Sequence, residues 1–336
     1  VIAQPKFQWR MATSWTPAFD VLQGSAQQFA KIVDEMSAGR LKIQVFAAGE
    51  LIPALGVFDA CSQGTIEAYN AASYYFAGKE PATQWFTAVP FGLNAQGTSA
   101  WYHYGGGLQL WEETYKPFNM IPRPGESTGV QMAGWFRKKI NTIGDFKGLK
   151  MRIPGLGGKV VAKAGGSVVL MPGGEIYTSL ERGVIDATEW VGPHDDMKLG
   201  LHRTARYYYH PGWHEPGATT EFVFNKKAYE SLPADLQRTL DYAAAAIQTF
   251  GLGDYEAKNA IALNKLRTEF KGKVEILPLS TAVMKDLKKL ADEVNKEEAA
   301  KTPIAKKVYE SYTKFQSQIA DWGRISEGSY HDVIAG

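Results

Sequence analysis

The sequence predicts an α/β fold with two lobes, joined by hinge strands and followed by long C-terminal helices. Three observations support this class. The chain has 336 residues and 45% hydrophobic side chains, enough for more than one core. Strand-like and helix-like patterns alternate from its beginning. A weak internal repeat aligns residues 58–70 with residues 177–189 without a gap, as expected if each lobe contains one copy.

The first part of the chain reads as strand, helix, strand, helix. Alternating apolar and polar residues predict strands over 7–11 and 41–45. Apolar residues at helical spacing predict a helix over 21–36, and a proline start predicts a short helix over 53–64. This order is typical of a doubly wound sheet.

Both copies of the repeat run from an amphipathic helix through a glycine, Gly64 or Gly183, into a short apolar strand. Two interpretations are open. Such units recur in any α/β protein. Alternatively, each of two similar lobes delivers a strand end to a shared cleft, where open α/β sheets bind ligands.

Two segments are predicted to cross between the lobes. Residues 121–125 contain two prolines, which exclude a helix, and residues 207–217 combine prolines and glycines with aromatic residues. The elements predicted around them are strands over 129–136, 148–153 and 218–224 and a short helix over 157–164. The expected domain limits are 1–123 with 214–250 for lobe I, 124–213 with 251–300 for lobe II, and 301–336 for a C-terminal helix.

A long helical pattern covers residues 233–270, and we expect a break or a bend near Gly251 to Gly253 because few globular helices are this long. A strand over 274–277 follows, and Ser280 is a candidate cap for the next helix.

The last helix is predicted from Thr302 as N-cap and Pro303 to Gly323. Its apolar residues recur at spacings of three and four: Ala305, Val308, Tyr312, Phe315, Ile319 and Trp322. Such a seam docks either on its own lobe or on another subunit. We expect the helix to expose three aromatic rings on one stripe, those of Tyr312, Phe315 and Trp322. Because soluble monomers seldom tolerate such an apolar patch, we expect a homodimer joined through this helix.

Composition excludes several classes of protein. Lys plus Arg number 37 and Asp plus Glu 35, and a net charge of +2 does not indicate a nucleic acid partner. Cys61 is the only cysteine, which excludes an internal disulfide and a multi-thiolate metal site. No apolar run reaches the roughly 18 residues of a membrane helix. The chain begins at Val1 without a leader segment, which fits an exported protein whose signal peptide is absent or a shortened chain.

Three motifs are considered and set aside. Gly125–Gly129 matches a serine-hydrolase nucleophile elbow, but prolines precede it and a predicted strand follows it. Gly155–Gly158 lacks the third glycine of a dinucleotide fingerprint. His210, His214 and Glu215 could suggest a transition-metal triad, but the chain between the histidines cannot form the helix that would align them. A metal site made of Glu215 and oxygen ligands from elsewhere in the chain is the preferred alternative.

The remaining candidates are polar residues at predicted strand ends and crossings, with aromatic residues around them. They are Asn70, Gln131, Arg152, Glu189 and Glu215, surrounded by Tyr74, Tyr75, Trp135, Trp190 and Trp213. Taken singly, Arg152 and Gln131 could be ordinary surface residues. Glu189, however, lies between apolar and aromatic neighbours and must be either solvated or paired. An arginine opposite carboxylates suits a small anion held through a hard cation.

Four segments together resemble the solute-binding proteins of TRAP transporters, and most closely the branch that binds 2-oxo acids. They are Gly129–Arg137, Gly148–Arg152, Ile185–Pro193 and Tyr207–Glu215. Their order and spacing hold from about Phe7 to past Glu221, whereas the C-terminal third resembles the branch only in layout.

The resemblance implies a two-lobed, periplasmic-binding-protein-like receptor, located in the periplasm and not an enzyme. It would capture a small 2-oxo monocarboxylate and deliver it to a TRAP membrane permease. It also implies that proteins of this branch can exchange a C-terminal helix between protomers. The alternative function is a metal-assisted enzyme acting on a 2-oxo acid, with Glu189 or Glu215 as its base.

By the same resemblance, Arg152 clamps the ligand carboxylate. A sodium or calcium ion is coordinated by Gln131, Glu189, the main chain of Trp190, and Glu215. The physical chemistry agrees, since two buried glutamates and a substrate anion need a cation in addition to the arginine. Asn70, Tyr74 and Trp213 complete the expected ligand site.

The sequence departs from this branch on one side of the expected pocket. His214 stands where a second aromatic residue is expected beside Trp213, and Phe76-Ala77 follow the tyrosine pair where bulkier or more polar rings are usual. Longer or branched 2-oxo acids and 2-hydroxy acids therefore stay open as ligands.

Overall fold

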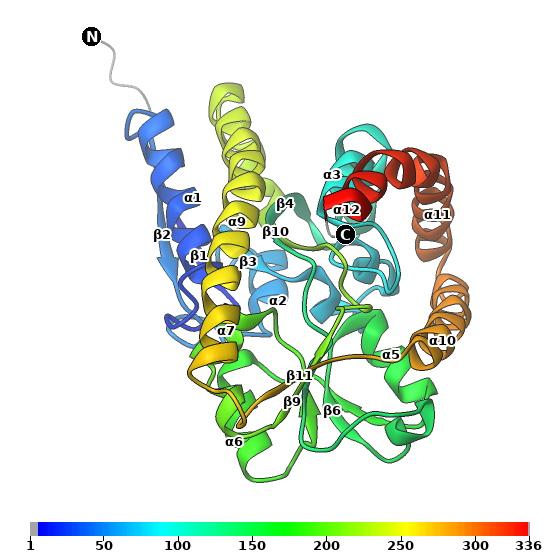
Figure 1. Ribbon diagram of the computed structural model, residues 1–336. Helices are drawn as coiled ribbons and strands as arrows, with labels where there is room; N and C mark the ends of the chain where they lie inside the picture. The colour runs from blue at the N-terminus through cyan, green and yellow to red at the C-terminus, as the bar shows by residue number, and fades with distance from the viewer. Residues whose placement is uncertain (1–5, 335–336) are drawn as a thin grey trace.

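The computed structural model describes residues 6–334 and contains two β-sheets, each flanked by helices (Figure 1). Sheet I has the strand order β2-β1-β3-β10-β4, and sheet II has the order β11-β9-β5-β8-β6-β7. The strands of sheet I are β1 (Phe7–Thr13), β2 (Leu41–Phe46), β3 (Ala68–Ala71), β4 (Met120–Gly129) and β10 (Ala218–Asn225). Those of sheet II are β5 (Gly134–Phe136), β6 (Lys150–Arg152), β7 (Ser167–Val169), β8 (Ala187–Thr188), β9 (Tyr207–His210) and β11 (Glu275–Pro278).

Helices cover both sheets, and the C-terminal part of the chain is helical. They are α1 (Leu22–Met36), α2 (Val57–Ser62), α3 (Ala95–Tyr104), α4 (Gly107–Tyr115), α5 (Gly155–Lys163), α6 (Gly173–Glu181), α7 (Pro193–Lys198), α8 (Lys226–Glu230), α9 (Ala234–Thr268), α10 (Thr281–Ala299), α11 (Pro303–Gly323) and α12 (Ser329–Ile334). No helix in the described part of the chain is long and apolar enough to cross a membrane.

The predicted opening of the fold is confirmed. In β1, Trp9 and Met11 are buried while Gln8 and Arg10 are exposed, as the alternation predicts, and β1 pairs in parallel with β2 and β3. The two copies of the repeat occupy equivalent positions. One runs from α2 into β3 of sheet I and the other from α6 into β8 of sheet II, and Gly64 and Gly183 both adopt positive φ.

The first predicted crossing is wrong. Residues 121–125 lie inside β4, which pairs antiparallel with β10 and forms the edge of sheet I. An edge strand tolerates prolines because its outer side needs no backbone donors. The chain crosses at residues 130–133 instead, so the strand expected over 129–136 is divided between β4 and β5.

The break expected in the long helix is also wrong, since α9 is continuous over 35 residues. Gly251 serves packing here, because a Cβ at that position would lie 2.4 Å from the Cβ of Glu126 in β4. The expected lobe limits at 123/124 and 250/251 therefore fall inside β4 and α9, and the exact domain limits stay a proposal.

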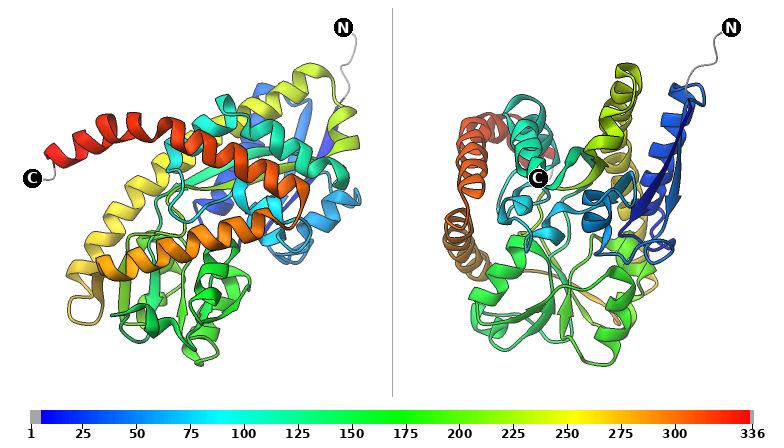
Figure 2. Two further views of the ribbon diagram at one scale, coloured as in Figure 1. Left: turned by 90° about the vertical axis from the view of Figure 1, so that its right-hand side faces the viewer. Right: turned by 180° about the vertical axis from the view of Figure 1, so that it is seen from behind.

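The C-terminal helices pack along both lobes (Figure 2). Helix α10 contacts α5 of the sheet II lobe and then α11, which lies against α3 and α4 of the sheet I lobe. Ala305, Val308 and Tyr312 of α11 are buried, and the backbone N–H of Leu93 donates to the Tyr312 hydroxyl at 2.7 Å. The first half of the seam therefore docks on its own lobe.

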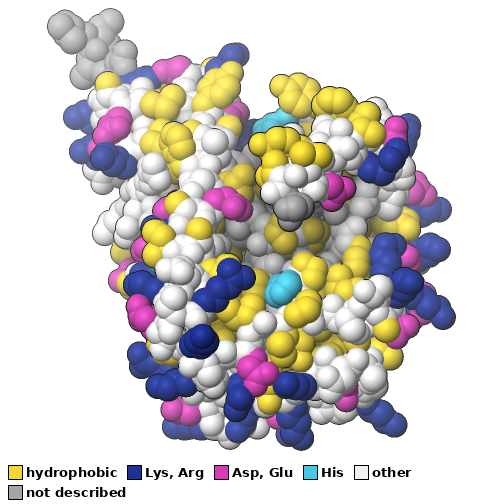
Figure 3. Space-filling view, in the orientation of Figure 1, with side chains coloured by type: hydrophobic (Ala, Val, Ile, Leu, Met, Phe, Trp, Pro, Cys, Tyr) yellow, Lys and Arg dark blue, Asp and Glu magenta, His cyan; other side chains and the backbone are white. Residues whose placement is uncertain are grey.

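The second half of α11 and the turns after it are different. Phe315 is only half-buried, whereas Trp322 is 67% exposed. The expectation that Tyr312, Phe315 and Trp322 form one exposed stripe is thus wrong for Tyr312, which packs on Trp101. Beyond it, apolar side chains gather on the surface near the end of the chain (Figure 3). The exposed large apolar residues of this part of the chain are Trp322, Ile325, Tyr330, Val333 and Ile334.

Glu298, at the end of α10, connects the C-terminal helices to both lobes. Its carboxylate accepts from Gln84 at 3.2 Å and lies 2.9 Å from Nζ of Lys159 and 2.6 Å from Nζ of Lys301. Burial opposes ionisation, but the hydrogen bonds from these lysines outweigh it and hold the pKa of Glu298 below its usual value.

We expect Glu298→Gln to lower the free energy of unfolding by about 1 kcal/mol near neutral pH. Because the folded pKa is depressed, this contribution is present above the unfolded value of 4.5 and is lost as the pH falls through the folded value. Urea unfolding at several pH values measures it. The matched control is Glu297→Gln, which removes a more exposed partner of Lys163; equal losses in the two variants would contradict the assignment.

Candidate functional site

The candidate residues meet where strands of sheet II end and where the chain crosses between the sheets. Arg152 is the last residue of β6, and Glu189 directly follows β8. Gln131 lies in the crossing over 130–133 and Glu215 in the crossing over 211–217. These crossings lie side by side, because the backbone N–H of Gln131 donates to the Glu215 carbonyl at 3.1 Å. Convergence of these segments follows the rule that open α/β sheets bind ligands beyond their strand ends.

Gly212 makes this close approach possible. A Cβ at position 212 would lie 2.1 Å from the carbonyl oxygen of Gln131, which no side chain could occupy. The glycine of the aromatic segment thus brings the two crossings together.

Arg152 and Glu189 form a buried ion pair in the site. Nη1 of Arg152 lies 2.5 Å from Oε1 of Glu189, and Nε of Arg152 donates to the Met171 carbonyl at 3.2 Å. Arg152 is 1% exposed and Glu189 fully buried. The guanidinium also lies 5.1 Å from the ring centroid of Trp190, within reach of a cation–π interaction. These contacts fix the orientation of the arginine.

Several polar atoms of the site are buried and, among the residues that the structure describes, make no hydrogen bond. They are Oε1 of Gln131, Nη2 of Arg152, and both carboxylate oxygens of Glu215. Such atoms are costly unless a ligand pairs with them. Burial, and next the charge of Glu189, raise the pKa of Glu215 well above its usual value. The oxygens fit a hard cation and the guanidinium N–H fits an anionic oxygen, so the residues suit both parts of the predicted ligand.

His214 joins this group, although the triad of His210, His214 and Glu215 was set aside on the sequence. Its side chain is fully buried, and Nε2 lies 3.3 Å from Oε2 of Glu189. A Cβ at Gly157 of α5 would lie 2.8 Å from the Cβ of His214, so the histidine can pack here only because residue 157 is a glycine. Glu189, His214 and Glu215 each offer one ligand atom within 4.8 Å of the others.

The remaining predicted residues occupy different positions. Tyr74 follows β3 and packs against Gly155 at the start of α5, and burial, then the charge of Glu215, raise its pKa. Trp213 packs against Phe91 and His214.

The side chain of Asn70 is already hydrogen-bonded to other residues of the protein. Its Oδ1 accepts from Nε1 of Trp15 at 2.5 Å, and its Nδ2 donates to the Glu221 carbonyl at 3.0 Å and to Oε2 of Glu126 at 3.4 Å. A direct role of Asn70 with the ligand stays a prediction, and the structure favours a supporting one.

Sequence reasoning missed part of the pocket wall. A cavity of ≈ 20 Å³ adjoins the site, lined by Trp15, Leu22, Ala72, Tyr74, Tyr75, Thr87, Thr128, Gln131, Trp190, Val191, Ala218, Thr219 and Thr220. The hydroxyls of Thr219 and Thr220 are buried and unpartnered within residues 6–334. Trp15 follows the end of β1, so the strand-end rule that selected Asn70 could also have selected it.

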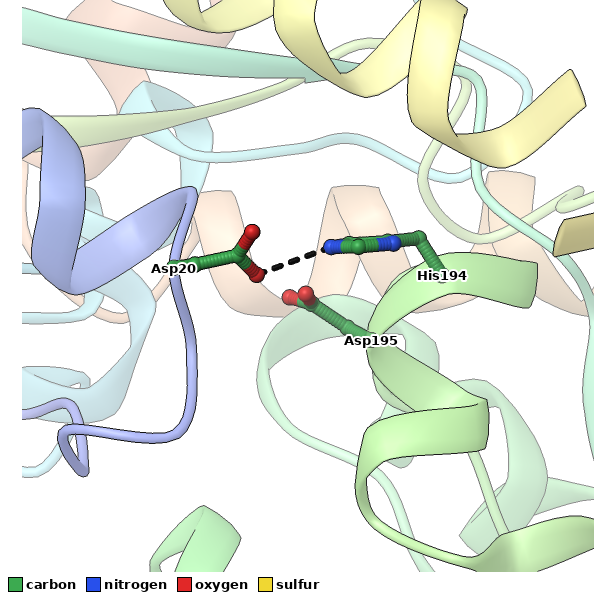
Figure 4. A group of neighbouring side chains, drawn as sticks. All are labelled: Asp20, His194 and Asp195. Carbon is green, nitrogen blue, oxygen red and sulfur yellow. Dashed lines mark hydrogen bonds and ion pairs between the residues drawn. The ribbon is translucent and has the colours of Figure 1, made fainter. Parts of the chain in front are cut away.

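A set of contacts joins the two lobes, and Figure 4 shows one of them, between Asp20 and His194. Asp20, ahead of α1, lies 2.8 Å from Nε2 of His194 and 3.0 Å from Nζ of Lys198, both on α7, and 3.0 Å from Nζ of Lys258 on α9. We call these residues the interlobe clasp. Burial opposes ionisation of Asp20, but the hydrogen bonds from His194, Lys198 and Lys258 hold the pKa of its carboxyl well below the usual range.

We expect Asp20→Asn to weaken ligand binding about threefold to tenfold, because these partly exposed pairs stabilise the closed arrangement over the site. Calorimetry measures the change. The matched control is Asp59→Asn, which removes the Lys79 pair within lobe I; unchanged affinity for Asp20→Asn would show that the clasp does not contribute to closure.

Comparison with known proteins shows the family to which the chain belongs. Residues 11–302 match the family model DctP, described as bacterial extracellular solute-binding protein, family 7. The chain belongs to this family. The predicted resemblance to TRAP solute-binding proteins and the two-lobed α/β class are therefore confirmed, and the enzymatic alternative is set aside.

Three relatives of this DctP-family protein are informative. A monocarboxylate 2-oxoacid-binding periplasmic protein of Nostoc sp. is 46% identical over 331 residues, covering 98% of this chain and 90% of the relative. A Pseudoalteromonas atlantica TRAP protein with bound sodium and pyruvate is 42% identical, with TM-score 0.94 and coverage of 97% and 99%. A Bordetella bronchiseptica TRAP protein is 39% identical, with TM-score 0.95 and coverage of 98% of each chain. That structure is a mixed-occupancy dimer, with calcium and picolinate in one site and the other site apo.

Proposed function

We propose that this protein captures a small 2-oxo monocarboxylate together with a sodium or calcium ion and delivers it to a TRAP permease from the periplasm. One observation carries the proposal. In the described chain, an arginine N–H and three acceptor oxygens are buried at one place without partners, on Arg152, Gln131 and Glu215. The unpaired N–H can bind an anion and the unpaired oxygens can bind a cation, so together they suit an anion–cation pair.

Charge explains why the two would bind together. Arg152 is already paired with Glu189, which leaves Glu215 and an incoming carboxylate without a counter-charge. A cation between them converts two costly buried charges into ligands. We assign Gln131, Glu189, the main chain of Trp190 and Glu215 to the cation, and Nη2 of Arg152 to the carboxylate. The relatives that hold pyruvate with sodium and picolinate with calcium support this pairing.

The wall of the site favours a short ligand. The cavity beside it measures ≈ 20 Å³ and combines apolar residues such as Trp15 and Val191 with the hydroxyls of Thr219 and Thr220. Tyr74 and Trp190 are among its lining residues. A 2-oxo acid with a small tail fits this wall better than a dicarboxylate, whose second charge would have no cationic partner among the lining residues.

The proposal is tested by denaturing the purified protein and identifying the released small molecules by mass spectrometry. Calorimetry of the ligand-free protein with pyruvate, with and without calcium or sodium, is the second measurement. We expect stoichiometric, cation-dependent binding of 2-oxo acids without turnover. Tight binding of a different chemical class, and none of 2-oxo acids, would overturn the proposal.

We also propose that the protein is a homodimer joined through the end of its C-terminal helix. The buried half of α11 anchors the helix to its own lobe, while the apolar side chains from Trp322 to Ile334 are exposed. The helix also projects past the body of the molecule (Figure 2). An apolar helical end of this kind is usually covered by another subunit.

Removing residues 324–336 in a variant that also carries Trp322→Ala tests this proposal, because the buried half of α11 is kept. Light scattering should give a dimer for the full chain and a monomer for the shortened one. Ligand binding should persist, since every proposed site residue lies before position 216. A full-length monomer, or a shortened dimer, would place the interface elsewhere or remove it.

A further inference from the structure

A second cavity lies where three helical segments meet, outside the site for the cation. The 3₁₀ helix η2 (Pro81–Phe86) and the loop after it form one side of this cavity. Helices α10 and α11, which pack against each other, form the other sides (Figure 2). We call this space, which measures ≈ 300 Å³, the α10–α11 cavity. Cavities that bind small organic molecules measure roughly 300 to 1,000 Å³, so this one has room for a compact molecule.

Two residues that line the α10–α11 cavity have buried polar atoms without a partner. Within residues 6–334, neither Nε1 of Trp85 nor Oδ1 of Asn295 makes a hydrogen bond. Trp85 is 1% exposed and Asn295 is 8% exposed, so bulk solvent does not satisfy these atoms. Buried polar atoms are costly when they lack a partner. Water or a ligand in the cavity must therefore pair with one donor and one acceptor.

A larger groove around α2 and α8 of the sheet I lobe shows the contrast. It measures ≈ 950 Å³. Its polar residues have partners: Asn225 donates to the Cys61 carbonyl at 2.8 Å, and Glu67 pairs with Arg10 at 3.2 Å. Among the described residues, none that lines this groove has a buried polar side-chain atom without a partner. Volume alone thus does not indicate a ligand, whereas the unpartnered atoms of the α10–α11 cavity do.

The walls of the α10–α11 cavity combine aromatic rings with one positive charge. The rings of Trp85 and Tyr309 are inclined at 67°, with their centroids 6.3 Å apart. A planar ring packs well against such aromatic surfaces. Lys288 and Asp292 pair with each other at 2.6 Å, so Lys296 is the charge of the lining that remains. An anion with a flat body matches this combination.

Phe91 holds one wall of the cavity in a fixed position. Its φ of +56° is unusual for a bulky residue and requires support from its surroundings. The N–H of Phe91 donates to the Trp213 carbonyl at 2.8 Å, and its carbonyl accepts from Nε2 of Gln316 in α11 at 3.0 Å. Because both backbone groups are bonded, this wall is preformed.

We propose that the α10–α11 cavity is a second binding site, for a small aromatic carboxylate that also carries a hydroxyl or amino group. The carboxylate accepts from Nε1 of Trp85 and is attracted by Lys296, while the hydroxyl or amino group donates to Oδ1 of Asn295. The ring of the ligand packs against Tyr309. This site is separate from the site for the 2-oxo acid and needs no cation.

The test titrates the protein with para-hydroxybenzoate and with benzoate by calorimetry, alone and with saturating pyruvate and calcium. We expect para-hydroxybenzoate to bind in both conditions, and about tenfold more tightly than benzoate, which has no donor for Asn295. Asn295→Leu keeps the size of the side chain and should abolish this preference. Lys296→Gln should weaken both compounds about threefold to tenfold. Lys289→Gln changes an exposed lysine of α10 outside the lining and, as the matched control, should alter neither affinity.

The outcomes separate this site from the proposed function. Binding of para-hydroxybenzoate that pyruvate and calcium abolish, and that is unchanged in Lys296→Gln, would place the compound in the 2-oxo acid site and overturn the second site. No binding of either compound would mean that water alone occupies the cavity, which also overturns it. A failure of pyruvate to bind would overturn the proposed function and not this site. If Asn295→Leu is unstable, Lys296→Gln decides, because Lys296 is exposed and its replacement leaves the core unchanged.

Discussion

Replacing Arg152 with alanine should weaken the binding of pyruvate by about 2 to 4 kcal/mol, because a charge-assisted contact is lost in a site closed to solvent. Nη2 of Arg152 is buried and has no partner in residues 6–334, so it is the donor left for the ligand. Isothermal titration calorimetry with calcium present measures the loss. The same variant leaves Glu189 without its ion-pair partner, and a lower melting temperature is expected as well.

Arg152→Lys separates these effects. Lysine keeps the positive charge beside Glu189 but cannot hold Glu189 with one nitrogen and the ligand with another. Binding should therefore fall less than in the alanine variant, while stability recovers. Arg10→Ala is the control, since Arg10 pairs with Glu67 near the surface, away from the cleft. An affinity for pyruvate that is unchanged in Arg152→Ala would remove this arginine from the site.

Much of the site was predictable from the sequence because it follows from strand ends. Arg152 ends β6 and Glu189 directly follows β8; these strands are parallel neighbours, and Arg152 is paired in register with Thr188. The parallel arrangement alone brings such residues to one edge of the sheet. The alternation of buried and exposed residues in β1 and the N-caps of α10 and α11 were also predictable, because each depends only on residues close together in the sequence.

The parts that were missed depend on packing between distant segments. Gly251 reads as a helix breaker, yet it lies where β4 approaches α9, and the helix continues through it without interruption. Asn70 was expected at the ligand but is engaged by Trp15 and Glu126, which no local pattern indicates. The clasp at Asp20 joins residues more than 170 positions apart. Such contacts are fixed by the fold as a whole and leave no periodic trace in the sequence.

Removing the cation should weaken pyruvate binding about tenfold to a hundredfold, because Glu215 and the ligand carboxylate would then share a buried site without a counter-charge. Exhaustive chelation in sodium-free buffer, followed by calorimetry with and without added calcium, measures this dependence. Binding that is equally tight without any cation would leave the two glutamates as structural acids.

Glu215→Gln should reduce both the affinity for pyruvate and its dependence on the cation, since the amide keeps one oxygen ligand but loses the charge that holds the ion. Glu221→Gln is the matched control. Glu221 is equally buried, but its carboxylate accepts from the hydroxyls of Tyr69 and Tyr115 at 2.8 and 2.7 Å, so its own partners satisfy it. Burial raises the pKa of Glu221 to about 8. The cation dependence should therefore survive in Glu221→Gln and decrease in Glu215→Gln; a decrease of equal size in both would mean that burial of a carboxyl group, rather than ligation of an ion, controls binding.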